Sequence, residues 1–390
     1  MAHKKKRIKF LIILLFFAAY FFIAARPVPR EIILVPGWIN QLTDIGLADN
    51  VFREDSFLED DISEPVLSVF SGQLIPFTLG SRFGFVDSSG QFAINRVMSD
   101  NIYLNQHMWT EYSAEPENIV INNILNGTTI NIDNPKGYPI LLDNRVFILG
   151  SAQNSLSEID GNGNILWTYE LGAPLTCIDA AAGLVVTGSL DGAVEVFNSS
   201  GERVFYFEPG GSRYSVILGV AISRNGSRIG IVSGIEQQRF LLLERFGNAS
   251  NEYKVIYHEF LETGFRRPVR VLFIDEDQRV IFEREGGIGC YNIRSRRGIN
   301  IQLDGEIAAI DESGNQGFFF IITSHPMQEK KLVGIRFPSD RLFGFSRMSA
   351  QDAVFMRASF KSSDVFLGRT GSMLVAGGGT ALISFNLEEK

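Results

Sequence analysis

The sequence predicts an all-β fold of repeated sheets, on three observations. One pattern occurs twice at an offset of 38 residues, so that Gly150 corresponds to Gly188 and Gly163 corresponds to Gly201. The chain has 38 Gly and 32 Phe among 390 residues, as expected of many short strands separated by turns. Its length accommodates a ring of units of roughly 40 residues each. We therefore predict a seven- or eight-bladed β-propeller, preceded by an N-terminal transmembrane helix.

Each repeat unit reads as short strands joined by tight turns. In the first copy an apolar strand precedes a hairpin whose strands, 156–159 and 165–169, flank the turn Asp160-Gly-Asn-Gly163. Asp at the first position of a type I turn accepts backbone N–H groups, and Gly at the fourth tolerates positive φ. One large aromatic side chain per unit suits the space between neighbouring sheets. The equivalent positions are Gly150 and Gly188, Asp160 and Asn198, Gly163 and Gly201, and Trp167 and Phe205.

The motif formed by Gly150-Ser151, Ile159-Asp160, Gly163 and Trp167 resembles the repeat of the PQQ-type β-propellers. That superfamily includes quinoprotein dehydrogenases and the propeller subunit of the outer-membrane β-barrel assembly machinery. The resemblance covers about 65 residues, and it implies a fold rather than a function because propellers host unrelated activities. It leaves open both a quinone-dependent enzyme and a non-enzymatic interaction domain.

Further strands are expected on both sides of the double repeat. Phe83–Ile94 aligns with the central hairpin at an offset of 73 residues, which places a diverged blade at about 97–135. Later candidate blades are 220–257, 269–301, 307–345 and 354–385. We expect the last strand, 381–386, to pair with N-terminal residues and close the ring, because closure removes exposed sheet edges.

The N-terminus predicts export. Residues 1–9 form a basic tail, and residues 10–25 are continuously apolar, giving a helix of about 24 Å that is short for a bilayer. Both an uncleaved anchor and a cleaved signal peptide are therefore open. Residues 26–65 are expected to be a linker and acidic connector, and residues 66–390 the propeller. The basic tail predicts a single-pass protein of the bacterial inner membrane, N-terminus inside and propeller in the periplasm.

Charge excludes one class of partner. Residues 1–30 hold seven of the 36 Lys and Arg residues and none of the 44 acidic ones, so the remainder carries 29 positive and 44 negative charges. Such an acidic body is unsuited to nucleic acid, whose binding depends on neutralising phosphates. The predicted partners are proteins, bound through rim loops, and the membrane, through residues 10–25.

No catalytic or metal-binding constellation is present in the sequence. The four His residues are far apart, with no metal-ligand spacing, and no cofactor is predicted. Quinoprotein enzymes have adjacent cysteines near the cofactor, whereas Cys177 and Cys290 are isolated here. We expect two free thiols rather than a bridge.

One group of arginines is a candidate interaction patch. Its members precede and follow the strands of a single predicted blade: Arg266, Arg267, Arg270, Arg294, Arg296 and Arg297. If blade starts and hairpin ends meet at one rim, six guanidinium groups suit carboxylates, phosphate groups or an acidic partner. The alternative is ordinary ion pairing with the interleaved acidic residues. The sequence thus favours a membrane-anchored interaction scaffold of the cell envelope, with a role in envelope or outer-membrane protein assembly, and leaves a quinoprotein-like oxidoreductase or a ligand-sensing propeller as alternatives.

Overall fold

The computed structural model describes residues 13–20, 31–42, 70, 73–247, 252–262, 264–313, 317–337 and 353–389. The chain divides into two compact units, residues 1–35 with 387–390 and residues 36–386. Of the predicted anchor, only residues 13–20 are described, and they are helical and exposed. No helix in the described ranges combines the length and the apolar character that a membrane crossing requires. The basic tail and most of the expected acidic connector lie outside the described residues.

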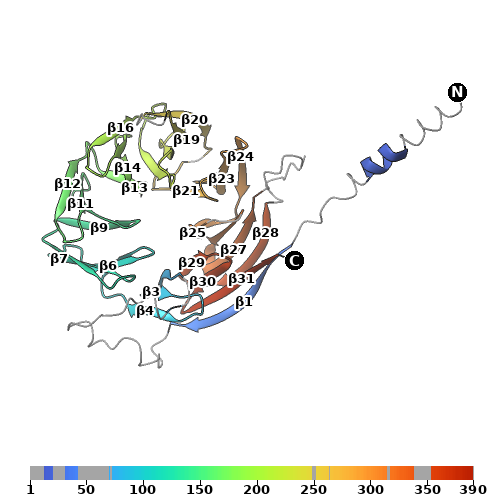
Figure 1. The fold of residues 1–390 in the computed structure, drawn as a ribbon, viewed down its shortest axis with the longest axis horizontal. Helices are drawn as coiled ribbons and strands as arrows, with labels where there is room; N and C mark the ends of the chain where they lie inside the picture. The colour runs from blue at the N-terminus through green and yellow to red at the C-terminus, as the bar shows by residue number, and fades with distance from the viewer. Residues whose placement is uncertain are drawn as a thin grey trace. The chain divides into compact units, whose positions relative to one another are not determined.

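Within residues 36–386, eight sheets are arranged round a ring, so the described chain has eight blades (Figure 1). We number the blades in chain order from β2. Blades 1 to 4 comprise β2 (Ile75–Leu79), β3 (Arg82–Val86) and β4 (Phe92–Val97); β5 (Asn101–Leu104), β6 (Met108–Tyr112), β7 (Asn118–Asn123) and β8 (Thr129–Asp133); β9 (Gly137–Leu142), β10 (Arg145–Gly150), β11 (Ser155–Ile159) and β12 (Ile165–Glu170); and β13 (Leu175–Ala181), β14 (Leu184–Ser189), β15 (Val194–Phe197) and β16 (Arg203–Phe207).

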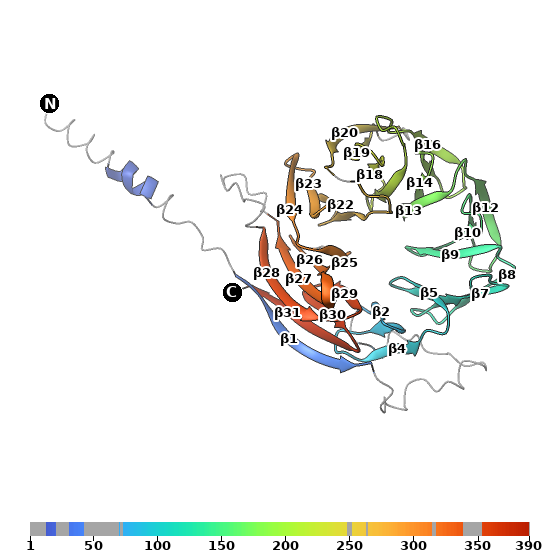
Figure 2. The same ribbon diagram turned by 180° about the vertical axis from the view of Figure 1, so that it is seen from behind.

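The second half of the ring is seen best from behind (Figure 2). Blades 5 to 7 comprise β17 (Ile217–Ile222), β18 (Arg228–Ser233), β19 (Arg239–Arg245) and β20 (Tyr253–Phe260); β21 (Val271–Ile274), β22 (Arg279–Arg284), β23 (Gly287–Asn292) and β24 (Arg297–Gln302); and β25 (Glu306–Ile310), β26 (Phe318–Ser324), the 3-10 turn η3 (Pro326–Gln328), β27 (Glu329–Arg336) and β28 (Val354–Lys361). Blade 8 comprises β29 (Val365–Thr370), β30 (Met373–Gly378), β31 (Ala381–Glu389) and β1 (Ile32–Gln41).

Blade 8 confirms the predicted closure by both chain ends. The outer strand β1 pairs with β31, the Trp38 N–H donates to Ser384 Oγ at 2.8 Å, and the Leu42 N–H donates to the Thr380 carbonyl at 2.7 Å. Two expected boundaries were wrong. β1 lies inside the range 26–65 that we expected to be a connector, and β28 pairs with β27 in blade 7 rather than opening the last blade.

The turn chemistry of the double repeat is confirmed. Asp160 Oδ1 accepts the N–H groups of Asn162 and Asn164, both at 2.8 Å, and Gly163 follows at φ +86°. In the next blade Asn198 takes the same role, and Gly201 has φ +76°. These turns therefore set the register of β11 with β12 and of β15 with β16.

The core lies between blades. Trp167 of blade 3 stacks on Phe197 of blade 4, with centroids 6.2 Å apart, and the α-carbon of Gly201 abuts its ring. Phe205 of blade 4 contacts Tyr253 of blade 5, with ring centroids 5.0 Å apart and the rings tilted by 54°. Both predicted inter-blade aromatic positions are confirmed.

Blade 1 has three strands in the described chain. Its inner strand, β2, is antiparallel to the inner strands of the two neighbouring blades. Gly80, after β2, lies beside Asp364, before β29, while Gln73, before β2, accepts a hydrogen bond from Thr370 at the end of β29. A chain that traverses three strands finishes on the opposite face from one that traverses four. Since β4 leads directly into β5, β2 must run antiparallel to the inner strands on either side of it.

Candidate functional site

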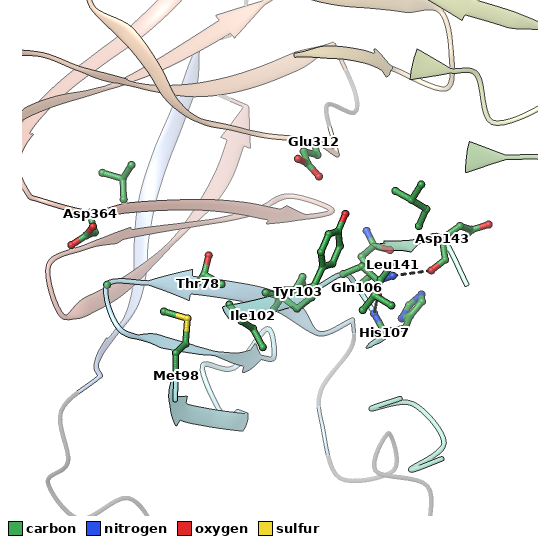
Figure 3. Close-up of a pocket in the computed structure, with 16 residues that line it drawn as sticks. Thr78, Met98, Ile102, Tyr103, Gln106, His107, Leu141, Asp143, Glu312 and Asp364 are labelled. Carbon is green, nitrogen blue, oxygen red and sulfur yellow. Dashed lines mark hydrogen bonds between the residues drawn. The ribbon is translucent and has the colours of Figure 1, made fainter. Parts of the chain in front are cut away.

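Residues of several inner strands line two neighbouring cavities, which together we call the channel. We call the face where β13, β17 and β21 begin the entry face, and the opposite one the exit face; these strands are parallel, since Thr176 Oγ1 donates to the Ile217 carbonyl and the Val269 N–H to the Leu218 carbonyl. A cavity of about 950 Å³ includes Tyr103, Asp143, Glu312 and Asp364 in its lining. In Figure 3 the Tyr103 hydroxyl points toward the side where Glu312 lies.

Charge in the channel is unevenly distributed. The first cavity is lined by three carboxylates without a Lys or Arg, whereas a neighbouring cavity of about 750 Å³ shares Glu312 and adds Arg224, Arg270 and Arg369. Arg270 Nη1 lies 3.7 Å from Glu312 Oε1. Burial, followed by the negative charge of Glu312 and other groups, raises the pKa of Tyr103. This arrangement is suited to binding a polar ligand, and no group of three or more His, Cys, Asp or Glu side chains in the described ranges could hold a metal ion.

The first three predicted arginines lie together at the entry face, in the connector from blade 5 to blade 6. Arg267 Nη2 donates to the buried carboxylate of Glu283 at 2.6 Å, and Arg270 faces Glu312 in the channel. Arg266 is exposed and pairs with no carboxylate among the described residues. Ion pairing therefore accounts for Arg267 and contributes at Arg270, while Arg266 is open to a partner.

This connector belongs to a larger surface feature that we call the entry-face ridge, defined by residues 208–216, 234–239 and 261–270. The connectors 208–216 and 261–270 have nine and ten residues, whereas the other described connectors between blades have three or four. Ser212 Oγ donates to the Glu236 carbonyl at 2.6 Å, and the buried Gln238 side chain donates to the Phe265 carbonyl at 2.5 Å. The β18–β19 turn thus holds both long connectors, one on each side.

Aromatic and arginine side chains alternate along this ridge. Tyr214 is 48% exposed, and the Arg213 guanidinium lies over its ring at 5.5 Å. Phe265 is half-buried beneath Arg267, whose guanidinium is 4.7 Å from the ring centroid. Exposed aromatic and arginine side chains on a well-anchored backbone are the composition of protein-binding surfaces.

The other three predicted arginines lie at the opposite end of blade 6. Arg294 and Arg296 belong to the β23–β24 turn, and Arg297 pairs with Asn292 at the exit end of the sheet. The prediction that all six converge at one rim was wrong, because the strands of this blade separate the two triplets by roughly 15–20 Å. The structure therefore offers two separate basic sites rather than one patch.

Both cysteines are free, as expected, and Cys290 is buried. Burial raises the pKa of each thiol to about 12, so neither is a reactive thiolate at neutral pH.

Sequence reasoning missed the residues that the ring brings together. Glu312 follows β25, yet its charge affects Tyr103 of blade 2 and Asp179 of blade 4. Arg213 and Tyr214 lie in a connector without motif or repeat. The length of that connector, between predicted strands ending at 207 and beginning at 220, was the one available signal.

Comparison with known proteins agrees with this architecture. A family model described as a beta-propeller protein matches residues 1–376. An uncharacterized protein of Treponema pallidum (strain Nichols) is 26% identical over 359 residues, 91% of each chain. Among solved structures, BamB from Moraxella catarrhalis gives a TM-score of 0.52 at 12% identity, covering 80% of this chain and 96% of that one. Apo AztD from Citrobacter koseri gives 0.51 at 11%, covering 78% and 88%. The two structures share the fold, and identities this low carry no information about activity.

Proposed function

Because the chain belongs to this family of β-propeller proteins, we propose that it is a non-enzymatic scaffold that binds a partner protein at the entry-face ridge. The observation that carries the proposal is the ridge itself. Its two connectors are the longest described between blades, they are held by the β18–β19 turn, and they present Tyr214, Arg213 and Arg266 to solvent. A closed propeller does not need long connectors for stability, so the length of these two fits a binding role.

The partner chemistry follows from the free charges. Neither Arg213 nor Arg266 pairs with a carboxylate in the described part of the chain, although the body is acidic. A locally basic surface on an acidic protein favours a partner whose acidic groups match these positions and disfavours partners that are acidic throughout. The expected interface has the aromatic rings at its centre and the arginines at its rim.

We further propose that the protein is tethered to the bacterial inner membrane through residues 10–25, with the propeller in the periplasm and a role in envelope or outer-membrane protein assembly. The basic residues 4–9 beside the apolar run support the orientation. The assembly role is the one that members of the PQQ-type propeller superfamily with an envelope location perform, and it is proposed here on that likeness of fold alone. Protease added to spheroplasts should digest the propeller and leave it untouched in intact cells; protection in spheroplasts would contradict the topology.

The ridge is tested by site-specific photo-crosslinking in cells. A photoreactive residue at Tyr214 should give a discrete adduct with one protein, whereas the same residue at Ser199, exposed on the exit face, should not. Adding Arg213→Glu and Arg266→Glu to the Tyr214 probe should abolish the adduct, and adding Arg297→Glu should leave it. An adduct that survives the ridge reversals would overturn the proposal.

The channel supports ligand sensing as a second candidate function. The acidic cavity and the neighbouring cavity that contains arginines share Glu312 in their linings. Negative charge on one side and positive charge on the other suit a small zwitterionic molecule. If sensing is the function, a ligand that raises the melting temperature of the wild type should not raise that of Glu312→Gln. The quinoprotein alternative predicts dye reduction after addition of PQQ and calcium, which the scaffold does not.

A further inference from the structure

A second basic site lies at the exit face between blades 5 and 6. We call it the exit-face cup, a cavity of about 420 Å³ whose lining includes Arg228, Glu244, Ile256, Tyr291, Arg294 and Arg296. Arg228 already pairs with Glu244 at 2.7 Å inside it. Arg294 and Arg296 are exposed, and neither pairs with a carboxylate among the residues that the structure describes. The cup thus carries two unmatched positive charges.

The backbone at Arg296 has a conformation that is unfavourable for a residue with a side chain. Arg296 has φ +54°, and it is the last residue of the turn before the outer strand of blade 6. The corresponding turns of blades 1, 3 and 4 place Gly90, Gly163 and Gly201 in this left-handed region. A non-glycine residue there is strained, and such strain is concentrated at functional positions. Glycine would make a more stable turn and would remove the guanidinium from the cup.

Apolar groups line only part of the cup, beside its polar and charged groups. Tyr291 is buried and stacks on Tyr257 of blade 5, with ring centroids 4.0 Å apart, and Ile256 remains 43% exposed beside it. Arg296 lines the same cavity as Tyr291. Burial raises the pKa of the Tyr291 hydroxyl, and the positive charge of Arg296 opposes that rise. A ligand here meets an apolar surface and two guanidinium groups at once.

The neighbouring strand supplies main-chain partners. β20 is the last strand of its sheet, so its outer edge is unpaired in the described chain. The bulge at Ile256 precedes a regular stretch, Tyr257–Phe260, whose free backbone groups can accept an extended peptide. Inorganic anions use neither the apolar surface nor this edge, and anionic lipid and nucleic acid have no extended peptide backbone to pair with β20.

We propose that the exit-face cup binds a carboxylate side chain carried by an extended acidic segment of a partner protein. The carboxylate lies between Arg294 and Arg296, the adjacent apolar side chain of the segment covers Ile256, and its backbone follows the edge of β20. The site is independent of the entry-face ridge, because it lies on the opposite face and shares no residue with it.

The test uses the full chain in detergent and a fluorescein-labelled peptide that alternates glutamate with leucine; the same peptide with glutamine is the control. The glutamate peptide should bind at least about tenfold more tightly than the glutamine one, and Arg294→Gln or Arg296→Gln should each weaken it at least about fivefold. Arg297→Gln, at the first position of β24 and outside the lining of the cup, should change binding less than about twofold, since this side chain does not contact the ligand. Arg266→Gln should have no effect.

The decisive variant is Arg296→Gly. It should weaken the glutamate peptide as Arg296→Gln does and yet raise the melting temperature by about 1–2 °C, since it relieves the left-handed strain. A purely structural Arg296 would lose stability on the same change. Three results would each overturn the proposal. The first is equal binding of the two peptides, and the second is peptide binding that neither Arg294→Gln nor Arg296→Gln changes. The third is binding of inorganic phosphate or phosphatidylglycerol vesicles as tight as that of the glutamate peptide.

Discussion

Single side chains join neighbouring blades by hydrogen bonds between residues that no local sequence pattern links. Arg145 of blade 3 donates to both carboxylate oxygens of Glu158 at 2.7 Å and to the Leu184 carbonyl of blade 4 at 3.3 Å. Trp167 Nε1 completes the cluster by donating to Glu158 at 2.6 Å. The sequence predicted a packing role for Trp167, but its polar partners depend on the register of three strands. A buried carboxylate with three donors is a stable junction because all its charge is matched.

The close approach at Gly201 can be separated from its backbone conformation. A Cβ on Gly201 would lie 2.4 Å from the Trp167 ring, whereas a Cβ on Gly183, also left-handed at φ +74°, meets nothing within 4 Å. Gly183→Ala should cost about 1 kcal/mol for φ alone, and Gly201→Ala about 2–4 kcal/mol because Trp167 must also move. Urea unfolding of both variants measures the difference. An equal loss of unfolding free energy in the two variants would mean that the Trp167 ring can move away from the new Cβ without cost.

Asp179 makes the stability of the ring depend on pH. It joins two inner strands, since its Oδ2 accepts the N–H of Ile222 in β17 at 2.8 Å. Burial chiefly, with a smaller contribution from the charge of Glu312, raises its pKa from 3.8 to about 6. Because the folded pKa exceeds the unfolded one, the protonated carboxyl stabilises the fold at low pH, and this stability is lost as pH rises from about 4 to about 6.

Asp179→Asn removes this titration. The difference in unfolding free energy between wild type and variant should favour the wild type more at pH 4.5 than at pH 8, with the change complete above the folded pKa. Urea unfolding of both proteins at several pH values measures this difference. The contributions of the other titrating groups cancel in it, because the two proteins share them. Parallel pH profiles would show that Asp179 has an ordinary pKa in the folded protein.

At the scale of strands, features set by local turn chemistry were predictable and features set by pairing were not. The hairpin around Asp160 has the expected bounds to within one residue, and its repeat around Asn198 forms the same hairpin, because both turns are encoded within five residues. By contrast, the outer strands of five blades carry a bulge near their first residues, against the third strand in four blades and against β3 in the three-stranded blade 1. Such bulges twist an open edge away from pairing with other chains. Their positions follow from the partner strand, so a single-sequence pattern does not show them.

β1 shows why one strand of the ring was missed. Its sequence contains Pro36-Gly37, a pair typical of turns. In the sequence it is also far from the other strands of its sheet, although it pairs with β31 in the fold. On the outer edge of a sheet a proline needs no N–H partner. Gly37 allows Ser384 to approach, since a Cβ there would lie 2.4 Å from its hydroxyl oxygen. Closure at this place was predictable from the need to cover an edge, but the bounds of the strand were not.

Over the whole molecule, closure makes the two ends of the chain interdependent. β31 lies between β30 and β1, so deleting residues 381–390 leaves two edges open, and deleting residues 1–42 exposes the edge of β31. Both truncated proteins should form oligomers or aggregate, because unpaired strands recruit other chains. A chain beginning at residue 31 keeps β1 and should remain monomeric, whereas a chain beginning at residue 66, the boundary expected from the sequence, should behave like the truncated ones.

A strand added back in trans distinguishes loss of closure from general damage. A synthetic peptide of residues 31–42 should bind the chain that begins at residue 43 and raise its melting temperature in proportion to the logarithm of peptide concentration, because it binds only the folded ring. The same peptide should have no effect on the protein that begins at residue 31, whose edge is occupied. Size-exclusion chromatography with light scattering should show the complex returning to a monomer. A chain lacking β1 that is monomeric and melts unchanged, with or without the peptide, would mean that hydrogen bonds within the remaining blades hold the ring and that β1 is a covering rather than a closure.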